Sequence, residues 1–137
     1  MRRRLLVLAL FGIFLCSVSW AAEHTKDSLD KVKQQIADQK AILVDVREQG
    51  EWDRGHVQDA LLMPLSELKR STSDPAAKDK LVQSLSKDRI IYCHCAKGVR
   101  ALVAGNILEK LGYDVRPLSA GFDQLRNAGF PTVKSKE

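Results

Sequence analysis

The feature that most constrains the fold is an apolar run that ends in two cysteines and passes directly into a helical pattern. The run reads "IIYCHC", from Ile90 to Cys95, and has the continuous apolar character of a strand buried on both faces. After a short turn, apolar residues recur at helical spacing on one stripe: Leu102, Val103, Ile107, Leu108 and Leu111. Gly112 follows as a helix C-terminal cap. The segment therefore predicts a strand, a tight turn and a helix.

The same alternation recurs along the chain. We expect a helix over residues 28–39 and a buried strand over 41–46, followed by a polar turn or short helix. A brief strand ending at Pro64 and a short helix over 65–70 should come next. A helix capped by Asp74, with Pro75 at its first position, and a last short strand and helix within 113–131 complete the pattern. Strands that alternate with helices predict a single α/β domain, with a mostly parallel central sheet and helices on both of its faces.

The first residues have the pattern of a secretory signal peptide. Three arginines precede an uncharged run from Leu5 to Ala22, and small residues lie near its end. We expect residues 1–21 to be the signal, with cleavage after Ala21 or Ala22, and an exported domain over 22–137 in the periplasm or outside the cell. The alternative is a retained membrane anchor, because the run is borderline in length for a transmembrane helix.

Loss of the signal changes the charge of the protein. The whole chain has 22 basic and 17 acidic residues, and removing three arginines leaves 19 against 17, or +2. No basic patch interleaved with aromatic residues is present, so we expect no nucleic-acid partner. A membrane partner is expected only if the signal is not cleaved.

The turn "CAKGVR", residues 95–100, has the composition of an anion-binding site. Successive backbone N–H groups of a tight turn over a helix N-terminus form a nest that favours negative charge. Such a nest stabilises a thiolate at its mouth, which makes Cys95 the candidate nucleophile. Gly98 permits a turn that other residues resist. Arg100 provides a planar fork for an oxyanion, and Lys97 a mobile positive charge at the entrance.

The other cysteine is harder to interpret. Cys93 lies in the strand with the same side-chain parity as Cys95, and packing alone explains it as well as chemistry does. His94 should point to the opposite face and pack there rather than act in catalysis. A pair of cysteines two residues apart closes almost no loop, so it is a poor disulfide staple.

These motifs resemble those of the rhodanese-like sulfurtransferases. "CAKGVR" matches the family's six-residue loop, Cys-x-x-Gly-x-Arg, and "LVDVREQGEWDRGHVQDALLMPL" resembles its first signature, including Asp45, Arg47, Glu51 and His56. "LEKLGYDVRPLSAGFDQLRNAGFP" resembles the segment after the active-site helix. The similarity covers about residues 41–131, and with its signal the chain is similar to the small single-domain periplasmic rhodaneses.

The resemblance implies a ping-pong sulfur transfer. Cys95 attacks the outer sulfur of a small anionic donor such as thiosulfate and becomes a persulfide, and a thiol or cyanide then accepts the sulfur. Backbone N–H groups of the loop would hold the persulfide, from residues Ala96, Lys97, Gly98, Val99 and Arg100. Asp45 and Arg47 would brace the loop, although a purely structural ion pair explains them equally well. No cofactor and no metal is implied.

The chain departs from the family pattern at three positions. Ala120 precedes Gly121 where a second glycine is common, Leu125 stands where a tryptophan is frequent, and Asp59 replaces a glycine before Ala60. Because the loop itself is intact, we expect altered packing near the site rather than lost chemistry.

Three other functions compete with sulfur transfer. Related phosphatases and arsenate reductases need five residues between cysteine and arginine, whereas this chain has four from Cys95 and six from Cys93. A metal-binding module would use Cys93 and Cys95 for a soft ion, with His56 or an outside ligand completing the site. In a redox or sulfur-relay pair, Cys93 would resolve a persulfide or sulfenic acid on Cys95, but a disulfide between two residues so close in a strand should be strained.

Overall fold

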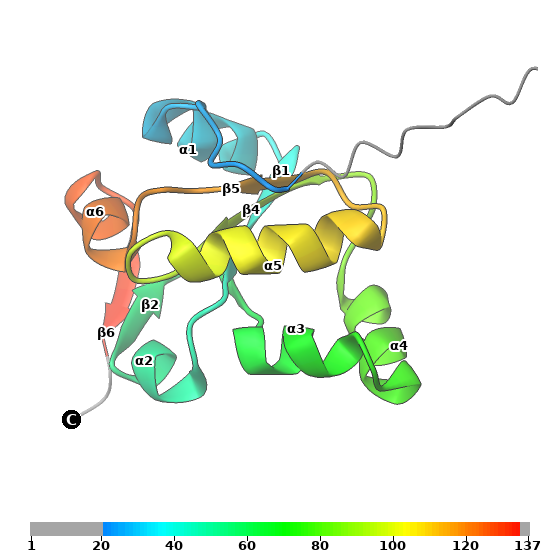
Figure 1. The fold of residues 1–137 in the computed structure, drawn as a ribbon. Helices are drawn as coiled ribbons and strands as arrows, with labels where there is room; N and C mark the ends of the chain where they lie inside the picture. The colour runs from blue at the N-terminus through cyan, green and yellow to red at the C-terminus, as the bar shows by residue number, and fades with distance from the viewer. Residues whose placement is uncertain (1–20, 135–137) are drawn as a thin grey trace, which may run out of the picture.

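The computed structural model describes residues 21–134, and the expected signal peptide lies almost entirely outside them. Four parallel strands form the central sheet in the order β3-β1-β4-β5 (Figure 1). These strands are β1 (Ala41–Asp45), β3 (Leu61–Leu62), β4 (Ile90–His94) and β5 (Val115–Pro117). The predicted parallel α/β sheet is confirmed, with the two longest strands at its centre.

Helices cover both faces of this sheet (Figure 1). One face carries α3 (Leu65–Ser71), α4 (Pro75–Ser84) and α5 (Val99–Lys110), and the other carries α1 (Leu29–Ala37) and α6 (Phe122–Asn127). The short helix α2 (Gln49–Asp53) follows β1. The predicted start of α4 is confirmed, because the Asp74 carboxylate accepts hydrogen bonds from the backbone N–H groups of Ala76 and Ala77.

Side-chain alternation along β4 divides the core into two layers. Ile91, Cys93 and Cys95 point into the layer under α3, α4 and α5. Tyr92 points into the layer under α1 and α6. Both layers bury their side chains almost completely, which fixes the strand and therefore the start of the loop that follows it.

The predicted apolar stripe of α5 is partly wrong. Leu108 is fully buried, but Val103 is 37% exposed, and the buried side of the helix also carries Ala101, Ala104 and Gly105. Small residues on this side let the helix backbone lie close to β5, since a Cβ on Gly105 would be 2.6 Å from the Pro117 ring. The stripe of large residues is therefore rotated away from the closest contact. Gly112 has a φ of +87°, as expected of a helix C-terminal cap.

A second, two-stranded sheet was not expected from the sequence. β2 (Gly55–Val57) pairs antiparallel with β6 (Thr132–Lys134), so the chain end described here closes back beside α2. Each strand has only three residues, too short for a periodic pattern to be recognised.

Candidate active site

The loop of residues 95–100 joins the carboxyl end of β4 to the first turn of α5. Gly98 has a φ of +88°, and a Cβ at this position would lie 3.0 Å from the Ser119 carbonyl oxygen. Both the backbone conformation and the space therefore select glycine, as the sequence predicted. Ala96, Lys97 and Val99 are exposed at the surface of the loop.

Cys95 lies beneath this loop with only 1% of its surface exposed. The backbone N–H of Gly98 donates a hydrogen bond to the Cys95 sulfur at 3.0 Å. An N–H directed at sulfur stabilises negative charge there, whether on a thiolate or on a sulfur attached to it. The predicted nucleophile and one predicted nest donor are thus brought into contact.

The far side of the loop is held by the segment that begins α6. The backbone N–H of Phe122 donates to the Cys95 carbonyl at 3.0 Å. Next to it, Gly121 lies so close to the loop that a Cβ would be 1.7 Å from the Ala96 carbonyl oxygen. Backbone therefore packs on backbone, and only a glycine at residue 121 permits the contact.

Arg100 forms a bidentate ion pair with Glu51 of α2. Its two terminal nitrogens contact the two carboxylate oxygens at 2.6 and 2.8 Å. The Arg100 hydrogen bonds lower the pKa of Glu51 to about 2, and they also raise the already high pKa of the arginine. The sequence predicted a free fork for an oxyanion, whereas the structure places both ends of the guanidinium on a carboxylate.

Asp45 and Arg47 form a second ion pair, buried at the end of β1. The Arg47 side chain contacts both carboxylate oxygens, at 2.7 to 3.0 Å, and donates to the Gly55 carbonyl at 2.9 Å. Its guanidinium carbon lies 4.4 Å from the centre of the Phe122 ring. Because Phe122 also bonds the Cys95 carbonyl, this pair reaches the loop through one intermediate residue.

The family model described as the rhodanese-like domain matches residues 28–128. The chain belongs to the rhodanese-like domain family. Among curated proteins it is similar to the uncharacterized protein YqhL of Bacillus subtilis, with 28% identity over 119 residues and 86% of each chain covered. It is also similar to the uncharacterized protein slr1261 of Synechocystis, with 36% identity over 111 residues, 77% of this chain and 55% of the other.

Solved structures of rhodanese-like proteins share the fold. The human single-domain sulfurtransferase TSTD1 has a TM-score of 0.61 and 26% identity, over 74% of this chain and 94% of the human one. The Alr3790 protein of Anabaena has a TM-score of 0.65 and 25% identity, over 80% of each chain. The similarity therefore supports a sulfurtransferase-type function for this rhodanese-like domain.

Cys93 is a buried thiol in this rhodanese-like domain. Its S–H donates to the Ala101 carbonyl at 3.4 Å, and both it and Cys95 are free thiols. Burial raises the pKa of Cys93 to about 12, and the charge of nearby Cys95 adds to the effect. At neutral pH the side chain is thus a protonated, packed thiol, which gives no support to its acting as a resolving nucleophile.

His94 and His56 have neighbours that suit structural roles. His94 is fully buried, with Nε2 3.6 Å from an Asp45 oxygen and Nδ1 3.2 Å from the Cys95 carbonyl oxygen, and burial lowers its pKa. His56 stacks on Trp52 at 3.7 Å and bonds the Trp52 carbonyl. Within residues 21–134, no three His, Cys, Asp or Glu side chains gather as a metal site would require.

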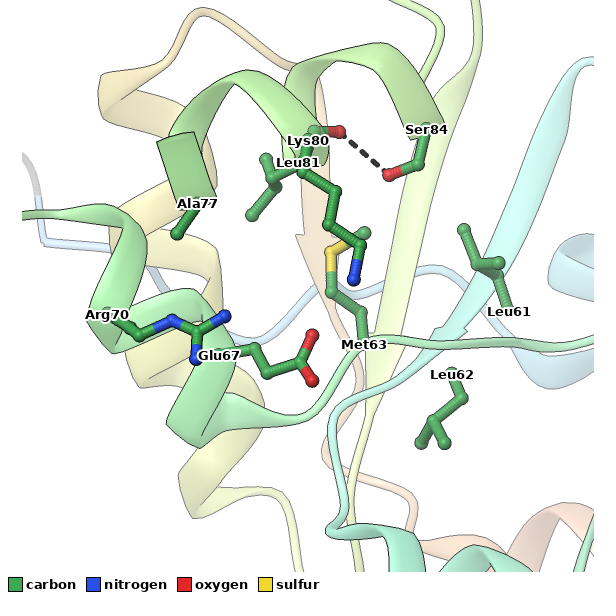
Figure 2. A pocket seen from close by; sticks show the side chains of 9 residues that line it. All are labelled: Leu61, Leu62, Met63, Glu67, Arg70, Ala77, Lys80, Leu81 and Ser84. Atoms are coloured by element: carbon green, nitrogen blue, oxygen red, sulfur yellow. Dashed lines mark hydrogen bonds between the residues drawn. The ribbon is translucent and has the colours of Figure 1, made fainter. Parts of the chain in front are cut away.

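Two pockets need to be distinguished. One, of about 200 Å³, lies next to the ion pairs and is lined by Arg47, Glu51, Arg54, Gly55 and Phe122. The other, also about 200 Å³, lies between β3, α3 and α4. Figure 2 shows its lining, in which the charged side chains of Glu67, Arg70 and Lys80 lie beside apolar ones. None of residues 95–100 lines it. Of the two, the first borders the residues that brace the loop.

Sequence reasoning missed two of the contacts that hold the loop. In the sequence, Glu51 is only one residue of the stretch that also contains Arg47, and no local pattern identifies Arg100 as its partner. Gly121 is notable in the sequence only because it follows the departure at Ala120.

In the part of the chain that the structure describes, no helix has the length and apolar character to cross a bilayer. The longest of these helices is α5, with 12 residues.

Proposed function

We propose that this rhodanese-like domain transfers a sulfane sulfur from thiosulfate or a similar small anionic donor to a thiol or cyanide, through a persulfide on Cys95. The observation that carries the proposal is the Gly98 N–H bonded to the Cys95 sulfur inside a Cys-x-x-Gly-x-Arg loop. The same donor can stabilise the attacking thiolate and the terminal sulfur of a persulfide.

The chemistry balances without a cofactor. In the first step the Cys95 thiolate attacks the outer sulfur of thiosulfate, a new S–S bond forms, and sulfite leaves with the electron pair of the broken bond. In the second step the acceptor thiolate or cyanide attacks the terminal sulfur, and the Cys95 thiolate leaves. Each step is a nucleophilic displacement at sulfur, so no external oxidant or reductant is consumed.

The surrounding residues have separate tasks in this proposal. Exposed Lys97 attracts the anionic donor toward the loop. Arg100, held by Glu51, keeps the first turn of α5 in place next to the loop that carries Cys95. Asp45 and Arg47 brace the loop through Phe122, because Phe122 contacts both the guanidinium and the Cys95 carbonyl.

A steady-state assay with two cysteine variants tests the proposal. Cys95→Ser should reduce thiocyanate formation from thiosulfate and cyanide to background, because a serine hydroxyl is not ionised near neutral pH. Cys93→Ser is the matched control, since the hydroxyl can keep the bond to the Ala101 carbonyl, and it should retain most activity. Equal loss in both variants would contradict a single nucleophile and favour the relay pair.

Export belongs to the same proposal. Residues 1–21 have the pattern of a signal peptide, so the mature domain would act in the periplasm or outside the cell. Cell fractionation together with the intact mass of the purified protein tests this. A mature chain that begins at Ala22 or Glu23 supports export, whereas a full-length protein in the membrane fraction supports a retained anchor.

A further inference from the structure

The segment from Ala22 to Asp27, here called the N-terminal strap, lies ahead of the family match, which begins at residue 28. It has no helix or strand of its own, yet it runs along α5 and β5 (Figure 1) and contacts the loop of residues 95–100 through His24. The strap therefore adds contacts outside the residues that the family model matches.

The beginning of the strap is fixed against α5 and β5. The Ala22 backbone N–H donates to the Asn106 side-chain oxygen at 2.6 Å. Ala22 is buried beside Gly105, where any larger residue would meet its methyl group at 3.1 Å. Further along, the Thr25 N–H donates to the Pro117 carbonyl at 2.8 Å. The strap is thus bonded to both elements that flank the loop.

The end of the strap is fixed by charge. One Asp27 oxygen accepts hydrogen bonds from the Tyr92 hydroxyl at 2.7 Å and from Arg116 at 2.9 Å, and the other contacts the Lys31 ammonium at 2.6 Å. Tyr92 lies in β4, three residues before Cys95. With both ends held, the residues between them, which include His24, have few ways to move.

Among these residues, His24 places its ring on the loop of residues 95–100. His24 Nε2 lies 3.0 Å from the Gly98 carbonyl oxygen, and since a carbonyl only accepts, the Nε2–H donates. Gly98 is the same residue whose N–H donates to the Cys95 sulfur. The Gly98 carbonyl also accepts the Leu102 N–H of α5, at a longer 3.4 Å. His24 thus supplies the shorter of the two bonds to a glycine that stands in the left-handed region, at a φ of +88°.

We infer that His24 is a positioning residue for Cys95: through the Gly98 carbonyl it holds the turn that aims the Gly98 N–H at the sulfur. Without the His24 bond, the longer bond from the Leu102 N–H remains on the Gly98 carbonyl, and a glycine has the conformational freedom to rotate its amide away from the sulfur. The inference rests on the proposed sulfur transfer for its kinetic consequence, but the positioning itself concerns only the loop.

The test compares variants expressed from the full sequence and purified as the cell processes them. His24→Leu removes the donor, and His24→Ala does so without adding apolar surface. His24→Gln keeps a side-chain N–H that can reach the same carbonyl. Lys33→Met is the matched control, because Lys33 also donates to a backbone carbonyl, that of Ala128, at 2.9 Å, but outside the loop.

Three quantities are measured for each variant: hydrogen–deuterium exchange at the Gly98 amide by NMR, kcat and KM for thiosulfate, and the melting temperature. We expect His24→Leu and His24→Ala to exchange Gly98 faster and to lower kcat by about three- to tenfold, the range expected for one hydrogen bond. KM should stay within about twofold, and His24→Gln should restore both quantities. Lys33→Met should change neither.

The inference is overturned if Gly98 exchange and kcat in the leucine and alanine variants equal those of the wild type. It is equally overturned if glutamine fails to restore them, or if Lys33→Met lowers kcat by the same factor. If the wild type transfers no sulfur, the proposed function fails, but exchange at the Gly98 amide still tests the positioning by His24. Faster exchange in the leucine and alanine variants, reversed in His24→Gln, supports the positioning. Unchanged exchange in those variants contradicts it.

Discussion

Each terminal nitrogen of Arg100 contacts a different carboxylate oxygen of Glu51, at 2.6 and 2.8 Å. The pair joins the first turn of α5 to α2 across 49 positions of the chain. One Glu51 oxygen also accepts the Glu48 N–H that begins α2, so the carboxylate fixes two helix starts together. The arginine of the loop is therefore oriented by the protein before any substrate arrives.

Replacing this carboxylate should impair sulfur transfer more than folding. Glu51→Gln keeps an oxygen for the Glu48 N–H but loses the ion pair with Arg100, so the first turn of α5 is held less firmly. We expect kcat/KM for thiosulfate to fall by about tenfold or more. The unfolding free energy should fall by only about 1 kcal/mol, because both side chains are partly exposed. A Glu51→Gln variant with normal kcat/KM would show that the ion pair is not needed to orient Arg100 for sulfur transfer.

The same pair predicts how stability depends on pH. The hydrogen bonds from Arg100 lower the pKa of Glu51 from 4.5 to about 2 in the folded protein. A carboxyl whose pKa is lowered by folding stabilises the protein above its unfolded value and loses this contribution as pH falls toward its folded value. The difference in unfolding free energy between wild type and Glu51→Gln should thus be constant above about pH 5 and shrink steadily below 4.5. Urea titrations at pH 7, 5 and 3.5 measure it, and a difference independent of pH would contradict the ion pair.

The two thiols should react differently with an alkylating reagent. Burial raises the pKa of Cys93 to about 12, so it remains protonated at pH 7 and has no solvent access. Cys95 is also buried, at 1% exposed, but it lies directly beneath the surface loop. Native protein treated with iodoacetamide at this pH should therefore be labelled slowly and on Cys95 alone, and both cysteines should be labelled after unfolding. Peptide mass spectrometry assigns the site. Equal labelling of Cys93 in the native protein would contradict this difference. It would show that β4 opens, or that Cys93 is a reactive thiol that can act with Cys95 as a relay pair.

The packing of Gly121 on the loop predicts a severe effect of a single methyl group. A Cβ at residue 121 would lie 1.7 Å from the Ala96 carbonyl oxygen, so Gly121→Ala must displace the loop backbone. We expect a loss of about 3 kcal/mol of unfolding free energy and of most sulfur transfer. Gly50→Ala is the control, because a Cβ there meets nothing within 4 Å and alanine suits a helix. Equal, small effects of the two substitutions would show that the loop lies further from α6.

Much of the fold was predictable because its signals are local. The apolar runs of β1 and β4 and the caps of α4 and α5 follow from neighbouring residues, and so does the turn at Gly98. Contacts between distant segments left no such signal. Nothing near Arg100 in sequence names Glu51 as its partner, and nothing near Gly98 points to His24.

The errors have a similar physical origin. The α5 stripe was predicted from large apolar residues, but Gly105 and Ala104 face the sheet because small residues permit close approach of the helix backbone. The sheet of β2 and β6 depends on pairing between chain segments more than seventy residues apart, which no local pattern encodes.

The intact mass of the purified protein tests the central claim most directly. Protein with reduced thiols is weighed before thiosulfate, after thiosulfate, and after subsequent cyanide, in wild type and in Cys95→Ser. We predict that thiosulfate adds the mass of one sulfur atom to the wild type and that cyanide then removes it. Cys95→Ser should gain no mass. No gain in wild type, or a gain that persists in Cys95→Ser, would contradict a persulfide on Cys95.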